Sequence, residues 1–204
     1  MEDMSLLAVL GLGLALGIKH ALEPDHVIAV STSAAKSRKV LQSAMTGIYW
    51  GIGHTLTMFV FGMAVILMQE QIPETWAQSL EALVGVMLIL VGATTFLSYK
   101  KSSSKQEGRS YKTSVFMGIV HGLAGSAALV LLTLSSVESA AEGAAFIFIF
   151  GAGTIVGMLL FTTVIGLPFV LTTKKWTINK GLTQAAGIIS AVYGVYYLSS
   201  IYFG

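Results

Sequence analysis

Runs of about 20 mostly apolar residues recur along the whole chain, separated by short polar links. A helix of roughly this length crosses a hydrocarbon core about 30 Å thick, and its backbone satisfies its own hydrogen bonds there. Charged residues make up 11% of the 204 residues, less than half of the roughly 25% found in soluble domains. The sequence therefore predicts an all-α, multi-pass membrane protein.

We predict six membrane-spanning helices from the positions of these runs. Eleven of the twelve Lys and Arg residues fall on the first, third and fifth links, and only Lys19 lies inside a span. The positive-inside rule then places these three links in the cytoplasm and both termini on the extracytoplasmic side of the cell membrane. The expected spans cover residues 5–34, 41–68, 79–98, 113–136, 143–171 and 181–203.

An internal repeat links the two halves of the chain. Residues 17–22 (GIKHAL) match residues 118–123 (GIVHGL) at an offset of 101, and glycines recur at offsets of 100 to 102 in the following spans. Each half holds three expected spans, an odd number, so the second half must be inverted. Inverted three-helix repeats are typical of transporters, although a duplication that built only a stable bundle would leave the same pattern. We expect the first repeat at 1–99, a basic cytoplasmic linker at 100–112 and the second repeat at 113–204.

Polar residues that can ligate a metal gather within the first span. His20, Glu23, Asp25 and His26 lie within seven residues of an otherwise apolar segment, where unpaired polar groups are costly. Six positions correspond to about 240° around a continuous helix, so the two His would diverge. Pro24 lies between them and predicts a break that lets both approach Asp25. Two imidazoles and a carboxylate suit Ni, Co, Zn or Fe; the alternative is a polar knot that ties helices together.

The other two histidines of the chain also lie in apolar runs. His54 is near the middle of the second expected span, between Gly53 and Thr55, which makes it a candidate additional ligand. His121 is the repeat mate of His20 but has no acidic neighbour, so a place on a transport path and a role in helix packing are both open for it. The candidate metal ligands are thus His20, Glu23, Asp25, His26, His54 and His121.

These motifs resemble those of the nickel/cobalt permease superfamily. Residues 20–26 (HALEPDH) resemble its His-x4-Asp-His signature, and residues 53–55 (GHT) resemble its second, Gly-His-Thr/Ser signature. The six-span branch, which includes urease accessory membrane proteins, is the most similar in length. The resemblance implies nickel or cobalt transport, with an ion site made by His20, Asp25, His26 and His54. The chain departs from the larger permeases in two ways: it has no acid-containing third signature, and Glu23-Pro24 replaces their usual Asp-Ala.

From these observations we predict a secondary transporter for a divalent cation, Ni(II) or Co(II), with inverted halves that rock around a midplane site. The cation is the substrate, and no resident cofactor is expected. No nucleotide-binding loop is present, so the chain does not hydrolyse ATP on its own. The expected partners are the cation and the lipid bilayer and not nucleic acid, while a homo-oligomer and a metallochaperone partner are both left open.

Three other functions are compatible with some of the motifs. An accessory subunit for the maturation of a metalloenzyme such as urease would need the same fold without transport. A membrane acyltransferase would use His20 and Asp25 as an acid–base pair, but the chain has only Arg38 and Arg109 for acceptor binding. An electron conduit would need paired cysteines, and the chain has no cysteine. We therefore expect a protein that is not an enzyme.

Overall fold

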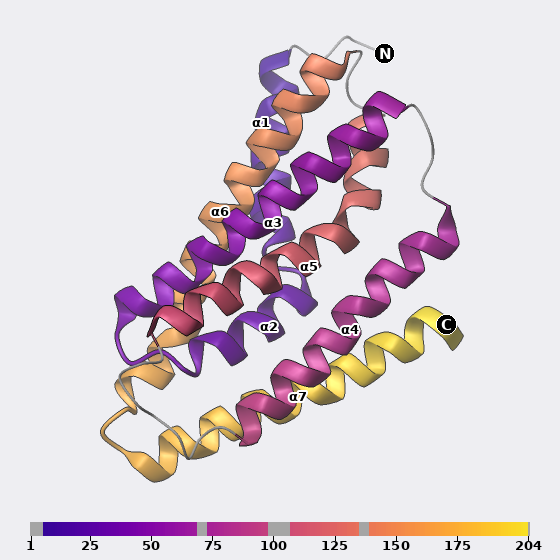
Figure 1. The fold of residues 1–204 in the computed structure, drawn as a ribbon. Helices are drawn as coiled ribbons and strands as arrows, with labels where there is room; N and C mark the ends of the chain where they lie inside the picture. Colours follow the sequence, from indigo (N-terminus) through magenta and orange to yellow (C-terminus); the bar gives the residue numbers. More distant parts are fainter. Residues whose placement is uncertain (1–5, 69–72, 98–106, 135–138, 204) are drawn as a thin grey trace.

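The computed structural model describes residues 6–68, 73–97, 107–134 and 139–203 (Figure 1). Within these ranges the chain forms α-helices and no strand, which confirms the all-α prediction. The helices are α1 (Leu6–His20), α2 (Pro24–Ala34), α3 (Val40–Met68), α4 (Glu74–Leu97), α5 (Glu107–Leu134), α6 (Ala140–Leu171) and α7 (Trp176–Phe203).

Membrane-spanning length and composition are found in most of these helices. α3, α4, α6 and α7 are each long and apolar enough to cross a bilayer, and the bent pair α1–α2 raises the number to five. α5 occupies the place of the fourth expected span, but it is not among the helices that meet this criterion in the described part of the chain. The chain is therefore a multi-pass membrane protein, while the number of six crossings stays a prediction.

The first expected span is broken at Pro24, as the sequence predicts. α1 ends at His20, α2 begins at Pro24, and the two helices are bent by 57° relative to each other. Glu23 has the extended backbone (φ −59°, ψ 144°) that a following proline favours. Pro24 then takes the first position of α2, where its missing N–H costs nothing. The break turns the chain so that residues on either side of it can face one point.

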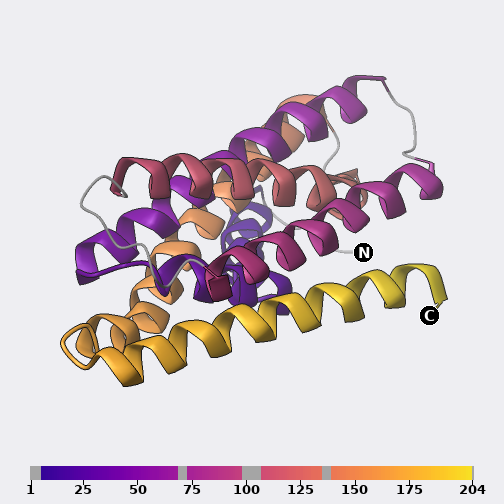
Figure 2. The same ribbon diagram turned by 60° about the horizontal axis from the view of Figure 1, so that its bottom comes forward.

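The helices pack in two groups, which are connected by α2 and by the packing of α5 against α4. α3 packs along α5 and α6, and α1 packs along α6. α4 and α7 form a separate pair along one flank of the bundle, as Figures 1 and 2 show. The short helix α2 contacts α3, α4, α6 and α7, and it therefore presents its side chains between the two groups.

Close backbone contacts at glycines position the central helices. A Cβ atom on Gly118 of α5 would collide with the carbonyl oxygen of Trp50, and one on Gly122 with that of His54. α5 can therefore approach α3 backbone to backbone only because these residues lack a side chain. This contact holds the turn of α5 that carries His121 against the turn of α3 that carries His54.

The helix ends beside the three basic links gather at one end of the bundle. In Figure 1 the C-terminal ends of α2 and α4 lie towards the bottom. The N-terminal ends of α3 and α5 and the α6–α7 connection lie there too. Residues 100–106 of the predicted linker lie outside the described residues, and residues 107–112 are part of α5. The common end is the arrangement that the predicted orientation requires.

Candidate metal centre

The structure brings all six candidate ligands into one cluster. His54 is the central residue of α3, His121 lies near the middle of α5, and His20 and His26 flank the break between α1 and α2. His26, His54 and His121 are no more than 2% exposed. Because His54 and His121 lie halfway along long helices, the cluster lies deep in the bundle, far from the ends of α3 and α5.

Three imidazoles form the first group of potential ligands. His20, His26 and His54 each offer one nitrogen, and these atoms lie within 4.8 Å of one another. The Nε2 atoms of His20 and His54 are 3.1 Å apart. Three imidazole nitrogens at such mutual distances can converge on one divalent transition-metal ion.

A second group shares His26 with the first. Asp25, His26 and His121 also offer three ligand atoms within 4.8 Å of one another. Asp25 Oδ1 is 3.1 Å from His26 Nδ1, and Asp25 Oδ2 is 3.5 Å from His121 Nε2. One carboxylate thus lies between two buried imidazoles, which makes this group a mixed nitrogen and oxygen site.

Hydrogen bonds at the outer edge of the cluster orient two of the rings. Glu23 Oε1 lies 3.0 Å from His20 Nδ1, and the carbonyl oxygen of Met117 lies 3.3 Å from His121 Nδ1. A proton on each Nδ1 atom satisfies these acceptors and leaves Nε2 with a free lone pair. The second ring nitrogen of a metal-binding His has this kind of partner in most metal sites. In this arrangement Glu23 orients His20, although the sequence left it open as a direct ligand.

Several ring nitrogens of the cluster have no hydrogen-bond partner. His26 Nε2, His54 Nδ1 and His121 Nε2 are buried and unsatisfied. A buried polar atom without a partner costs about 1–3 kcal/mol. A polar cluster that only tied helices together would therefore carry this free-energy cost. A cation that accepts the lone pair of His26 Nε2 or His121 Nε2 would remove part of this cost, and the donor set fits a transition metal.

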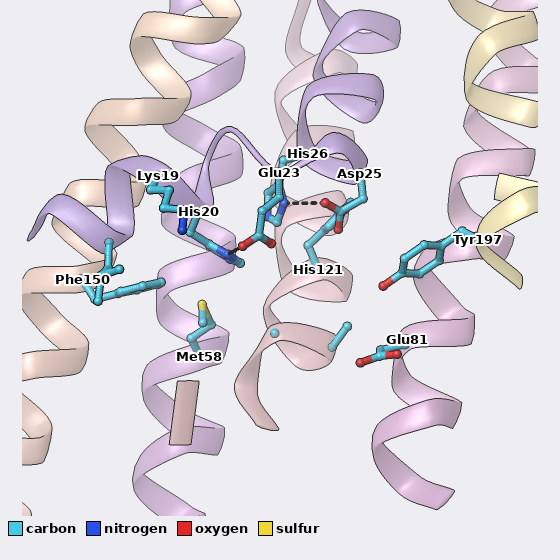
Figure 3. Close-up of a pocket in the computed structure, with 13 residues that line it drawn as sticks. Lys19, His20, Glu23, Asp25, His26, Met58, Glu81, His121, Phe150 and Tyr197 are labelled. Carbon is cyan, nitrogen blue, oxygen red and sulfur yellow. Dashed lines mark hydrogen bonds and ion pairs between the residues drawn. The ribbon is translucent and has the colours of Figure 1, made fainter. Parts of the chain in front are cut away.

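A pocket of about 270 Å³ opens onto the cluster. His20, Glu23, Asp25, His26 and His121 line it, whereas His54 lies behind them. Glu81 of α4 and Tyr197 of α7 also line the pocket, and neither residue belongs to the sequence motifs. Figure 3 shows both on the far side of the pocket from His20.

Glu81 could have been found from the sequence, and Tyr197 could not. Glu81 falls inside the expected span 79–98. A carboxylate within a membrane span is by default a functional candidate. Tyr197 gives no such signal because Tyr is common near the ends of membrane helices. Lys19 lines the same pocket but forms no ion pair with Glu23 or Asp25 in the described part of the chain.

The pairing of the carboxylates argues against acyltransferase chemistry. In such an enzyme Asp25 would orient His20, but the Asp25 carboxylate contacts His26 and His121. His20 pairs with Glu23 instead. The His20/Asp25 acid–base pair is therefore not formed.

Trp50 closes one side of the cluster. Its indole ring lies 5.2 Å from the His121 ring and 6.4 Å from the His26 ring, centroid to centroid, and the residue is fully buried. Trp50 does not line the pocket, so its indole forms an apolar neighbour of the two rings away from the pocket lining.

The fold and the site define a multi-pass α-helical membrane protein with a buried centre of imidazoles and one carboxylate. Over 98% of its length the chain is 48% identical to the urease accessory protein UreH of Bacillus sp. (strain TB-90), and the match covers 95% of that protein. The chain belongs to the UreH family.

The chain is also similar to more distant proteins. The chain is 28% and 26% identical to the Arabidopsis thaliana chloroplast proteins FOR GROWTH AND FERTILITY 2 and 1, and it spans 56% and 59% of their lengths. Residues 92–196, about half of the chain, match the family model of the cytochrome C biogenesis protein transmembrane region. This chain has no cysteine, so it carries no dithiol chemistry of its own. No solved structure matches the chain significantly.

Proposed function

We propose that the protein is a secondary transporter for a divalent transition-metal cation, Ni(II) or Co(II), in the cell membrane. The observation that carries this proposal is the convergence of His20, Asp25, His26, His54 and His121 deep in the bundle, with buried ring nitrogens that lack partners. A pocket leads to these atoms, as a site that must both load and release its ion requires. A closed structural site would not need such access.

The donor set supports a borderline or soft cation. Imidazole nitrogen suits Ni, Co, Zn and Fe, whereas Mg²⁺ and Ca²⁺ prefer oxygen. Among these metals, the two permease-like signatures at residues 20–26 and 53–55 favour nickel or cobalt. Two further carboxylates at the pocket, Glu23 and Glu81, add negative charge along the approach. Each would attract a dication towards the cluster.

The proposed transport mechanism is alternating access by two inverted repeats, residues 1–99 and 113–204. Reciprocal contacts between α3 and α6 support it. Gly51 lies against Ile155, and its repeat mate Gly151 lies against Thr55. Thr55 and Ile155 are 100 positions apart, as are Gly51 and Gly151. Such exchange of roles is what a two-fold axis between the repeats would produce.

The α4–α7 pair has the same reciprocity. Gly92 lies against Ala191, and its repeat mate Gly194 lies against Ile89. Gly92 and Gly194 are 102 positions apart, as are Ile89 and Ala191. Rotation of one repeat against the other about this axis would expose the cluster first to one side and then to the other. With both termini outside, a negative-inside potential would drive uptake by ~2.3 kcal/mol per charge per 100 mV, and about twice that for a dication.

A second function is favoured by the relatives. UreH is named as a urease accessory protein, and an accessory subunit that holds a metal or a partner without transporting it would show the same cluster. A metallochaperone or a second copy of the chain would then be its partner. This alternative differs from a transporter in one measurable property, which is net flux.

Metal flux into proteoliposomes tests the proposal. We expect saturable entry of Ni(II) or Co(II) into vesicles with a negative-inside potential, and loss of this entry in His26→Ala. Ser79→Ala, on the exposed face of α4, serves as the matched control and retains flux. If no metal enters under either polarity while the protein is monodisperse and binds Co(II), the accessory function replaces the transporter.

A further inference from the structure

His26 belongs to both groups of potential ligands. A neutral imidazole has one free lone pair at a time, because its other nitrogen carries the proton. His26 can therefore complete the group with His20 and His54, or the group with Asp25 and His121, but not both at once. The two groups are alternatives around a shared ring.

The two nitrogens of His26 have different surroundings. Nδ1 lies 3.1 Å from Asp25 Oδ1, and Nε2 is buried without a hydrogen-bond partner. The two atoms lie on different edges of the ring. With a proton on Nδ1, donated to Asp25, the lone pair of Nε2 is available to the imidazole group. With the proton on Nε2, the lone pair of Nδ1 joins Asp25 and His121.

We propose that the centre is two adjacent cation positions that share His26 and are occupied in turn, so that the ion passes from one to the other. This inference rests on the proposed transport function. The outer position consists of Asp25, His26 and His121, all of which line the pocket. The inner position consists of His20, His26 and His54, and it includes the fully buried His54, which does not line the pocket.

The two positions differ in chemistry in a way that suits a relay. The negative charge of Asp25 in the outer position offsets the free energy that a dication loses when it gives up water on entry. The inner position has only nitrogen ligands, which Mg²⁺ and Ca²⁺ do not accept readily, so it selects for transition metals. Each position offers three protein ligands and leaves further coordination sites open. Binding at either position is therefore weak enough for the ion to move on.

Co(II) titration of the purified full-length protein tests the relay, because the visible absorption of Co(II) depends on its ligands. The wild type should saturate at one Co(II) per chain. His54→Ala should keep one Co(II) at the outer position, and His121→Ala should keep one at the inner position. We expect the two spectra to differ from each other, and each affinity to fall by about 10- to 100-fold, the range typical of a perturbed metal site.

The double variant His54→Ala/His121→Ala leaves neither group complete and should bind Co(II) more weakly than either single variant. In proteoliposomes both single variants should lose Co(II) flux although both still bind the ion, because a relay needs both positions. The matched pair His54→Gln and His121→Gln keeps more of the side-chain volume and repeats the comparison if an alanine variant does not fold.

Three results would overturn the relay. Saturation of the wild type at two Co(II) per chain would show that the positions are independent. Loss of all binding in either glutamine variant would show a single position with shared ligands. Full flux in both single variants would place the positions off the transport path. If the wild type binds Co(II) with the expected spectra but shows no flux, the two positions stand and transport is what fails.

Discussion

The two halves of the chain share a packing scheme but differ in chemistry. Gly17 of α1 lies against the carbonyl of Phe150, and its counterpart Gly118 of α5 lies against the carbonyl of Trp50. The two interfaces are therefore built from the same kind of close contact. The candidate ligands, in contrast, come mostly from the first half, which supplies His20, Asp25, His26 and His54. Glu23 and Glu81, which line the pocket, also belong to the first half.

One pair of positions that match across the repeat illustrates this difference. His54 corresponds to Thr154, whose hydroxyl donates to the carbonyl oxygens of Phe150 and Gly17. One member of the pair thus serves a candidate ion site and the other serves helix packing. The comparison teaches that small residues maintain the scaffold in both halves, while the first half carries most of the candidate ligands and the second half contributes His121.

The largest expected effect tests the shared scaffold. Gly17→Val and Gly118→Val should both prevent correct folding, because each new side chain collides with a backbone carbonyl that cannot move away. Detergent-solubilised yield and monodispersity on size exclusion measure the outcome. Gly11→Ala in α1 is the control, since a Cβ there meets no atom within 4 Å. If one of the two valine variants alone had only a mild effect, the two interfaces would not be equivalent.

The second prediction separates chemistry from packing at matched positions. His54→Ala should reduce metal uptake by at least about 100-fold, because it removes a direct ligand. Thr154→Ala should leave uptake within about 2-fold and lower the stability of the protein by ~1 kcal/mol, the typical value of a hydrogen bond. Flux and thermal unfolding of the two variants decide this. Equal loss of flux in both would mean that Thr154 also contributes to the ion path.

The third prediction concerns the carboxylate that orients His20. Glu23→Gln keeps the size of the side chain but weakens its hydrogen bond to His20 Nδ1. We expect metal affinity to fall by about 10-fold, as for other groups that orient a metal ligand. Isothermal titration with Ni(II) measures this change. A loss as complete as that of His26→Ala would instead make Glu23 a direct ligand.

The smallest expected effect lies at the mouth of the pocket. Glu81→Gln should lower the uptake rate by about 5-fold at low salt, because the lost charge interaction of a group near water amounts to ~1 kcal/mol. Glu74→Gln in the first turn of the same helix removes an exposed charge outside the pocket and should have no effect. Initial rates at two salt concentrations compare the two. Equal rates for both variants would remove Glu81 from the ion path.

The sequence by itself determined the class of the protein and the local part of its site. Apolar run length requires membrane helices because unpaired backbone groups are not tolerated in lipid. Pro24 requires a break because its ring cannot continue α1, and the break lets residues 20–26 approach one another. These features depend on neighbours in the chain, so they can be read from it.

Only the tertiary structure decided how the distant residues join the centre. His54 and His121 could be nominated, but their assignment to different groups around His26 depends on how α5 packs on α3 at Gly118 and Gly122. Glu81 and Tyr197 reach the pocket because α4 and α7 both pack against α2. Helix pairing depends on the fit of surfaces far apart in the chain, and no local pattern encodes that fit.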